Sequence, residues 1–259
     1  MLQSIADASG DYHSFGTPCG DMEGKAVSTD VLDEFARTQW ETILYFMVGS
    51  EHTSVPRNTV LFLLQRAGLM QRDNSSSKKL NITSKGFQFL LQDVNSQLWA
   101  LLLQYLSMAE ERNMDLVEVL AFFFTVGGLE LGRAYETRGF STTQLQTLEE
   151  LSDYGLVYRP NKSAKHFFPT RLAATLTSTA SPLLLTLNDQ EEQGYLILET
   201  NYRVYAYTAN LLRISVLNLF VSLKSRLPNL VIGQLTRDSV KSALKKGITA
   251  DQIIAYLTH

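Results

Sequence analysis

The sequence has a single cysteine, four histidines and no long apolar run. One thiol, Cys19, cannot build an internal disulfide framework, which weakly favours a reducing compartment. None of the histidines has a second histidine or a cysteine at ligand spacing, so no bound metal is expected. The longest apolar stretches, around 98–106 and 116–131, are interrupted by Gln, Ser, Glu or Gly and stay below the roughly 18 residues of a membrane helix. The amino terminus also lacks the basic and apolar regions of a signal peptide.

Motifs that would carry catalysis or nucleotide binding are missing as well. No GxxxxGK[ST] sequence is present, and the glycines of 127–132 interrupt an apolar helical pattern with no strand before it, which favours helix packing or a kink. The stretch Gly139-Phe140-Ser141 lacks the nucleophile-elbow pattern. The acidic pair Glu149-Glu150 stands in polar surroundings, which are typical of a solvated face rather than of acid catalysis. We therefore expect neither enzyme activity nor a cofactor.

The chain does have enough apolar residues, 45% of 259, to bury substantial cores. Its formal net charge of -3 conceals two unlike parts. The segment 194–259 holds eight Lys and Arg but three Asp and Glu, a formal charge of +5, so the remainder stands at -8. The two parts are expected to meet different partners, and the basic part can face an acidic protein or a phosphate backbone.

Capping residues and glycines divide the first two thirds of the chain into elements. Residues 1–28 are rich in Gly, Ser and Asp and predict a flexible leader. Helices are expected at 28–49, 55–67, 83–112, 115–135 and 142–154, and short strands at 69–72 and 79–82.

The same order of elements returns 87 residues later in "DYGLVYRPNKSAKHFFPTRLAATL", which covers 153–176. There Gly155 stands where Gly68 does, and Thr170 where Thr83 does. Two helices, a hairpin and a flanking helix are typical of a winged helix. The sequence therefore predicts a mainly α fold with small β-hairpins, in which winged-helix domains at 29–113 and 114–178 stand in tandem.

The last part of the chain has a different pattern. A linker is expected at 179–193, where small residues, one proline and acids gather. Beyond it, 194–259 predicts a small α+β domain with strands in "YLILETNYRVYAYT", a helix at 210–227, a strand at 228–235 and helices at 236–246 and 249–257. Tyrosines supply large contact areas at protein interfaces, and four of them surround Arg203, so these strands favour a protein interface.

Winged helices raise the alternative of a tandem DNA-binding transcription regulator. A helix that reads DNA presents Arg, Lys, Asn or Gln to the bases and avoids acids near phosphates. The helix at 142–154 carries Glu149, Glu150 and Asp153, which disfavours this alternative.

The first unit is ambiguous, because Arg57, Asn58, Gln65 and Arg66 suit a helix that reads DNA. Its "VLFLL" stretch is apolar over more than one helical face, so Leu61 or Phe62 is expected to point to another protein. Its hairpin carries Arg72, Lys78 and Lys79, which leaves a weak contact with DNA open.

Three long stretches resemble a known family: "DEFARTQWETILYFMVG" at 33–49, "ITSKGFQFLLQDVNSQLWALLLQYL" at 82–106 and "ITADQIIAYLTH" at 248–259. They are similar to subunit 4 of general transcription factor IIH, which anchors the group B xeroderma pigmentosum translocase, and the resemblance covers most of the chain from Asp33. That family has a further N-terminal helical region and a C-terminal module that pairs with a very small stabilising subunit. The chain thus resembles a central fragment of it.

The resemblance implies a non-catalytic scaffold in a nuclear complex that serves initiation by RNA polymerase II and nucleotide excision repair. It implies that the winged-helix part packs on the von Willebrand A-type subunit, and that the following domain, the clutch, holds the translocase and stimulates its ATPase. From composition, the expected translocase contacts are Tyr195, Ile197, Glu199, Tyr202, Arg203, Tyr205 and Tyr207. The expected contacts of the winged-helix hub are Leu61, Phe62, Arg72, Lys78 and Lys79.

Overall fold

The computed structural model describes residues 27–49, 54–72, 80–112, 114–161, 164–177 and 195–258. Almost all of the predicted leader at 1–28 lies outside these ranges, as do the whole predicted linker at 179–193, Lys78 and Lys79. The described residues form mostly helices with small antiparallel sheets, which confirms the predicted mainly α class with β-hairpins. None of the described helices combines the length and the apolarity that crossing a membrane requires.

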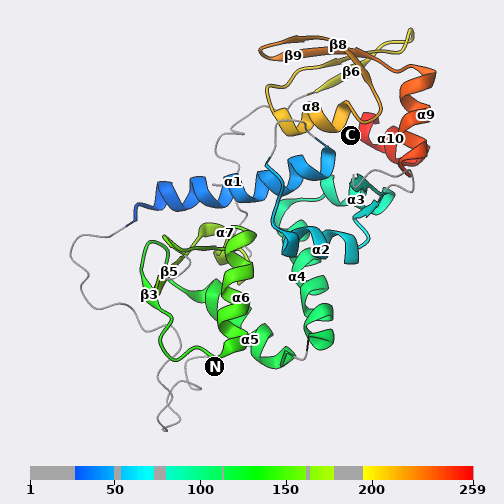
Figure 1. The fold of residues 1–259 in the computed structure, drawn as a ribbon. Helices are drawn as coiled ribbons and strands as arrows, with labels where there is room; N and C mark the ends of the chain where they lie inside the picture. The colour runs from blue at the N-terminus through cyan, green and yellow to red at the C-terminus, as the bar shows by residue number, and fades with distance from the viewer. Residues whose placement is uncertain are drawn as a thin grey trace.

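Helix α1 (Thr29–Val48) crosses the molecule and lies against both its upper and its lower part (Figure 1). The Ser28 hydroxyl accepts a hydrogen bond from the Val31 amide at 3.4 Å, and Gly49 ends the helix in the left-handed conformation, with φ 82°. These caps confirm the helix predicted at 28–49. Its buried side chains recur every three or four residues: Leu32, Ala36, Trp40, Ile43, Leu44 and Met47.

The 87-residue repeat in the sequence is also a repeat in the structure. The first unit runs through α2 (Asn58–Arg66), β1 (Met70–Arg72) and β2 (Leu80–Ile82), and the second through α6 (Thr142–Asp153), β4 (Val157–Tyr158) and β5 (His166–Pro169). Met70 pairs with Ile82 in the first hairpin, and Val157 pairs with Pro169 in the second. Both hairpins therefore have the same register, displaced by the length of the repeat.

A threonine closes each hairpin in the same way. The Thr83 hydroxyl is shared between the carbonyl oxygens of Gly68 and Leu69, 15 and 14 positions before it, at 2.7 and 3.1 Å. The Thr170 hydroxyl is shared between the carbonyls at the same offsets, at 2.7 and 3.0 Å. The matched residues of the sequence repeat thus make matched hydrogen bonds.

The long helix predicted at 83–112 is wrong, because the structure divides it into α3 (Ser84–Leu90) and α4 (Val94–Glu111). Asp93 caps α4 by accepting a hydrogen bond from the Ser96 amide at 3.0 Å, and hydrogen bonding to Ser96 lowers the pKa of the Asp93 carboxyl. The buried Gln97 side chain donates to the Phe89 carbonyl at 3.0 Å and accepts from the Trp40 indole at 3.4 Å. Gln97 thereby satisfies a carbonyl at the end of α3 that a continuous helix would have bonded.

The helix predicted at 115–135 is also too long. Helix α5 (Leu116–Gly128) ends at the paired glycines, and β3 (Tyr135–Glu136) follows and pairs with β5. Helix α7 (Arg171–Ala174) and the residues after it pack on α5 at Gly127, where an added Cβ would lie 2.8 Å from Thr177 Cγ2. The sequence left helix packing or a kink as the role of these glycines, and the close contact at Gly127 confirms helix packing.

One hydrophobic core joins the two repeated units. It buries side chains of α1, α2, α4, α5 and α6 together, including Phe123 and Leu148, whose exposure is 0%. Arg171 of the second unit also binds Asp33 of α1, with three nitrogen-to-oxygen distances of 3.1 to 3.2 Å. Because this core is continuous, the domain boundaries at 113 and 178 stay predictions.

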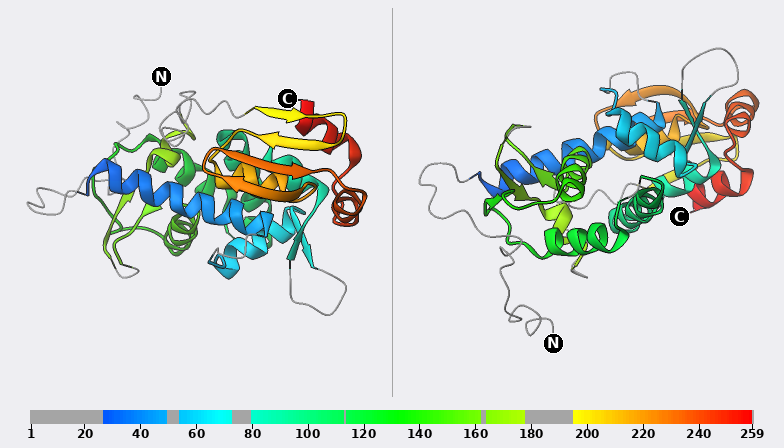
Figure 2. Two further views of the ribbon diagram at one scale, coloured as in Figure 1. Left: turned by 90° about the horizontal axis from the view of Figure 1, so that it is seen from above. Right: turned by 60° about the horizontal axis from the view of Figure 1, so that its bottom comes forward.

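The last unit is an antiparallel sheet in the order β6-β7-β9-β8, with helices packed beside it (Figures 1 and 2). Its elements are β6 (Leu196–Leu198), β7 (Arg203–Ala206), α8 (Leu211–Leu217), β8 (Ser222–Leu227), β9 (Leu230–Gln234), α9 (Arg237–Lys245) and α10 (Ala250–Thr258). The helix predicted at 210–227 is therefore wrong beyond Leu217. The strand predicted at 228–235 begins later, since Pro228 and Asn229 form the turn between the paired residues Leu227 and Leu230.

The core of this last unit includes residues from the first unit. Ile82 of β2 and Phe87 of α3 are buried in it. The Phe87 ring centroid lies 6.2 Å from that of Phe220 and 6.4 Å from that of Tyr256. The sheet and its helices are thus packed directly on α3.

Candidate functional site

Strand β6 lies at one end of the four-stranded sheet, and no described strand pairs with its outer side. Its backbone bonds to β7 at Tyr195 and at Glu199, which are four residues apart. In an antiparallel ladder the bonded residues alternate, so Ile197 is bonded to β7 as well. Leu196 and Leu198 therefore direct their backbone N–H and C=O groups outward, where another strand can pair with them.

The side chains along this edge are apolar and accessible. Tyr195, Ile197 and Leu198 are 58%, 42% and 45% exposed. Exposed apolar groups next to unpaired backbone groups are unusual on a sheet edge, because such edges are prone to pair with other chains. The edge of β6 therefore has both the backbone and the side-chain features of a protein-binding strand.

The turn between β6 and β7 leads directly into Arg203, the first residue of β7. The Asn201 side chain accepts a hydrogen bond from the Arg203 amide and donates one to the Glu199 carboxylate, both at 2.9 Å. Tyr202 has a positive φ of 67° and is 64% exposed. A bulky residue rarely adopts this conformation, so the backbone of the turn is strained at the position where the Tyr202 ring is exposed.

The two faces of β7 differ in burial. Val204 and Ala206 are buried, whereas Arg203 and Tyr207 are exposed and Tyr205 is half-buried. Across the ladder, the rings of Tyr195 and Tyr207 stack with centroids 4.5 Å apart and planes 19° apart. The structure thus gathers the predicted translocase contacts on one hairpin: Tyr195, Ile197, Glu199, Tyr202, Arg203, Tyr205 and Tyr207.

A groove of about 800 Å³ lies beside the stacked tyrosines, and the sequence did not indicate it. Its lining includes Leu217 of α8 and Tyr256 of α10. Burial raises the pKa of the Tyr256 hydroxyl. The apolar periodicity at 249–257 indicated a helix there, but only the fold places this helix next to β6.

The predicted hub contacts are spread over α2 and the first hairpin. Phe62 is 48% exposed and Leu61 is half-buried, so Phe62 is the surplus apolar residue of this helix. The Arg66 guanidinium lies over the Phe62 ring, 5.9 Å from its centroid. Arg72 is exposed at the end of β1, while Lys78 and Lys79 lie outside the described residues.

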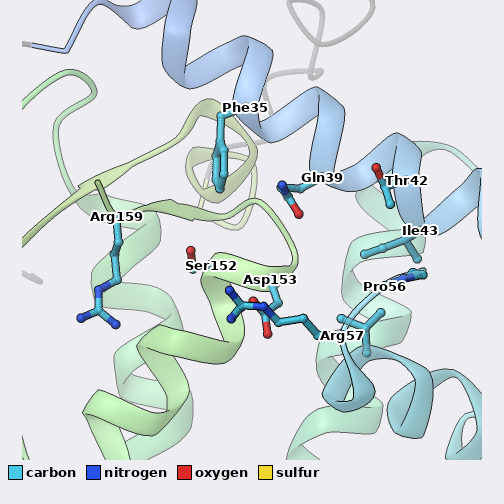
Figure 3. Close-up of a pocket in the computed structure, with 10 residues that line it drawn as sticks. Phe35, Gln39, Thr42, Ile43, Pro56, Arg57, Ser152, Asp153 and Arg159 are labelled. Carbon is cyan, nitrogen blue, oxygen red and sulfur yellow. The ribbon is translucent and has the colours of Figure 1, made fainter. Parts of the chain in front are cut away.

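Helix α6 borders a cleft of about 260 Å³ together with α1, β4 and the start of α2 (Figure 3). In it, the Arg57 guanidinium lies 2.6 Å from the Asp153 carboxylate, and the Thr59 hydroxyl donates to that carboxylate at 3.2 Å. Burial raises the pKa of Asp153, against the opposing influence of Arg57. Glu150 on the same helix binds Arg112 with both oxygens at 3.0 Å and is 6% exposed.

This arrangement corrects the solvated face predicted for the acidic pair. The prediction holds for the exposed Glu149 and is wrong for Glu150, which is buried. Asp153 and Glu150 of α6 pair with Arg57, just before α2, and Arg112, just after α4, so they bind these segments together instead of facing a ligand. Among the residues that the structure describes, no group of three or more His, Cys, Asp and Glu is placed to hold a metal.

Comparison with known proteins agrees with the resemblance carried by the sequence. A family described as transcription factor Tfb2 matches residues 1–259. A Yarrowia lipolytica protein named general transcription and DNA repair factor IIH subunit TFB2 is 49% identical over 258 residues, which cover 95% of this chain and 55% of that protein. The Saccharomyces cerevisiae protein of the same name is 43% identical, over 95% of this chain and 56% of its own length. General transcription factor IIH subunit 4 of Dictyostelium discoideum is 41% identical, over 91% and 50%.

Proposed function

We propose a function from one premise: the chain belongs to the transcription factor Tfb2 family. It is a non-catalytic subunit of general transcription factor IIH, the transcription and DNA repair factor after which its relatives are named. Its partners are other subunits of that factor, and its place is the nucleus. Since the chain spans about half the length of the curated relatives it matches, the activity of the whole protein is part of this proposal.

Within the factor, residues 194–259 form the clutch that anchors the group B xeroderma pigmentosum translocase. The observation that carries this assignment is the open edge of β6, where Leu196 and Leu198 direct backbone groups outward. A strand of the translocase would add to this edge by main-chain hydrogen bonds, and the exposed Ile197 and Leu198 side chains would select it. The formal charge of +5 on 194–259 favours an acidic partner, and Arg203 is its exposed cation on this hairpin.

Anchoring alone does not stimulate an ATPase. The clutch stimulates the translocase only if it binds the ATPase-competent arrangement of the translocase more tightly than the inactive one. A binding partner shifts the balance between two states only by the difference in its affinity for them. The strained Tyr202 turn is well suited to this role, since a fixed shape accepts one arrangement of a partner better than another.

The two repeated units are winged-helix domains that act as a hub for the von Willebrand A-type subunit. The identical hairpin register and the matched threonine bonds support the assignment of one common fold to both units. The alternative of a DNA-reading tandem loses support at α6, whose acids are bound by Arg57 and Arg112. Duplex DNA titrated at two salt concentrations tests that alternative, which would return if binding were tight and fell steeply with salt.

Proline at position 198 tests the strand-addition mechanism directly. Leu198→Pro removes an outward N–H while leaving the inward bonds of β6 to β7 intact, and proline is tolerated on the solvent side of an edge strand. We expect the affinity for the translocase to fall about tenfold or more, because the new strand loses a donor and the alignment that goes with it. Leu198→Ala, which keeps the N–H, is the matched control and should bind several-fold better than the proline variant. Equal binding by the two variants would contradict strand addition.

Charge reversal at position 203 tests the role of the basic hairpin. Arg203→Glu should weaken translocase binding about tenfold and reduce ATPase stimulation to match. Arg226→Glu, on the opposite edge strand β8, makes the same change in charge at an exposed position and should leave both readouts unchanged. A folded Arg203→Glu variant with full ATPase stimulation would count against the proposed function.

A further inference from the structure

Helices α4 and α5 lie away from the four-stranded sheet (Figure 1) and carry a second set of exposed apolar side chains. On α5, Val117, Leu120 and Phe124 are 75%, 38% and 46% exposed, and their spacing of three and four places them on one helical face. On α4, Leu103 is 59% exposed and Trp99 is half-buried. The helix α5 is apolar almost all round, so its core contacts leave this outer face uncovered.

The exposed residues of the two helices form one continuous surface. The rings of Trp99 and Phe124 lie with centroids 6.2 Å apart and join the two helices at one end. Leu103 lies one turn after Trp99 on α4, and Leu120 lies one turn before Phe124 on α5, so both residues extend the surface away from this ring contact. We call this surface the α4–α5 face. From Trp99 to the end of α4 at Glu111 it is about 18 Å long, which matches slightly more than three turns of a helix.

The charge on this face is of one sign and lies at one end. Glu110 and Asp115 are exposed where α4 passes into α5, and Glu118 is half-buried beside them. Neither helix contains a Lys or an Arg. Arg112, in the connection between them, is bound to the buried Glu150. The face is therefore an apolar stripe with an acidic end.

We propose that the α4–α5 face binds an amphipathic helix of a partner protein, about three turns long, with Lys or Arg at one end. Such a helix would lay its apolar stripe along Leu103, Val117 and Leu120 and bring its basic end to Glu110 and Asp115. The proposal rests on the proposed function, because the partner is sought among the other subunits of transcription factor IIH. It assigns to the hub a binding surface separate from Leu61, Phe62 and Arg72.

The charge pattern favours this occupant over a second copy of the chain. Two α4–α5 faces packed together would offer no cation to the acids of either copy, and burial of unpaired carboxylates is costly. A nucleic acid is disfavoured as well, because the two helices offer acidic and apolar side chains but no Lys or Arg to a phosphate. A basic amphipathic helix is the partner that matches both the shape and the charge.

The first experiment identifies the occupant. The full chain, with a photo-crosslinking amino acid at position 117, is assembled with the other purified subunits of the factor and irradiated. We expect cross-links to a helical segment with an apolar stripe and a basic end in another subunit. Cross-links to a second copy, to a segment without basic residues, or to none of the subunits would overturn the inference.

The second experiment measures the contact with a synthetic peptide of the cross-linked segment. Val117→Glu should weaken peptide binding about tenfold or more. Val55→Glu is the matched control, because Val55 is 70% exposed and lies in the segment before α2. This variant should bind the peptide as the wild type does. Glu110→Gln combined with Asp115→Ser should weaken binding several-fold and flatten its salt dependence, and serine keeps the cap that Asp115 provides to the Val117 amide. Unchanged binding by both sets of variants would contradict the proposal.

The two proposals fail in distinguishable ways. If the assembled factor shows full ATPase stimulation but no cross-link from position 117 to a basic helix, the α4–α5 inference is wrong and the proposed function stands. If the wild-type chain does not join the other subunits at all, the proposed function fails and the inference falls with it.

Discussion

Gly155 and Gly49 provide a controlled test of how closely the second unit is packed on α1. Their φ angles are nearly equal, at 81° and 82°. An added Cβ at Gly49 would meet nothing within 4 Å, whereas at Gly155 it would lie 2.9 Å from the carbonyl oxygen of Ala36 and 3.1 Å from Gln39 Cβ. Alanine at each position therefore imposes the same backbone strain, and only Gly155→Ala adds a clash with the backbone of a buried helix.

The magnitudes follow from these contacts. The left-handed conformation costs an alanine about 1 to 2 kcal/mol, partly offset by about 0.4 to 1 kcal/mol because alanine restricts the unfolded chain. Gly49→Ala should therefore lower the free energy of unfolding by about 1 kcal/mol. At Gly155 the overpacking adds about 1 to 3 kcal/mol, since α1 cannot yield where Ala36 is fully buried. The expected difference between the two variants is about 2 kcal/mol.

Urea unfolding followed by circular dichroism measures this difference as a shift in midpoint at constant slope. In thermal unfolding, Gly155→Ala should melt about 4 to 8 °C below Gly49→Ala. If the two variants agreed within about 0.5 kcal/mol, the turn between α6 and β4 could move away from α1 at little cost. The reasoning from close packing would then be refuted.

Two further predictions concern charged side chains. Glu150→Ala should lower the free energy of unfolding by about 2 kcal/mol, because it leaves the half-buried Arg112 without its partner. Glu111→Ala removes the exposed pair with Arg66 and should lower it by at most about 0.5 kcal/mol. Equal losses of stability in urea unfolding would contradict this prediction. Asp93→Asn should keep the cap of α4 but lose the charge. Because the folded-state pKa of Asp93 is lowered from 3.8, the stability from its charge is present above that value and is lost as the pH falls through the folded-state pKa. The wild type should therefore exceed the variant in urea midpoint at neutral pH and approach it well below pH 3.8, and a difference independent of pH would argue against the assignment.

Local signals that involve few residues were readable from the sequence. The caps at Ser28 and Gly49 delimit α1 because one side chain and one backbone conformation decide each end. The repeat was readable because Thr83 and Thr170 make bonds to carbonyls at fixed offsets within their own hairpins. In the same way, the pattern of "YLILETNYRVYAYT" indicated strands where β6 and β7 form.

The errors arose where a distant residue decides the local structure. Apolar periodicity continues smoothly across Asp93. At the break, the Gln97 side chain, which the Trp40 indole holds, donates to the Phe89 carbonyl that a continuous helix would have bonded. Strand β8 carries mostly exposed side chains, so no strand alternation marks it and the helix expected at 210–227 was extended over it. Its pairing with β9 is a tertiary effect. The open edge of β6 was not predictable for the same reason, since an edge is defined by the order of strands in the sheet.

The packing of Phe87 into the last unit has a mechanical consequence. A motor that pulls on DNA exerts an equal reaction force on whatever holds it. Under the proposed function, that load enters at β6 and passes through the ring cluster of Phe87, Phe220 and Tyr256, beside which Gln252 of α10 bonds both the backbone and the side chain of Ser84 on α3. Under that load, this packed joint would make the sheet and the helices beneath it move as one body.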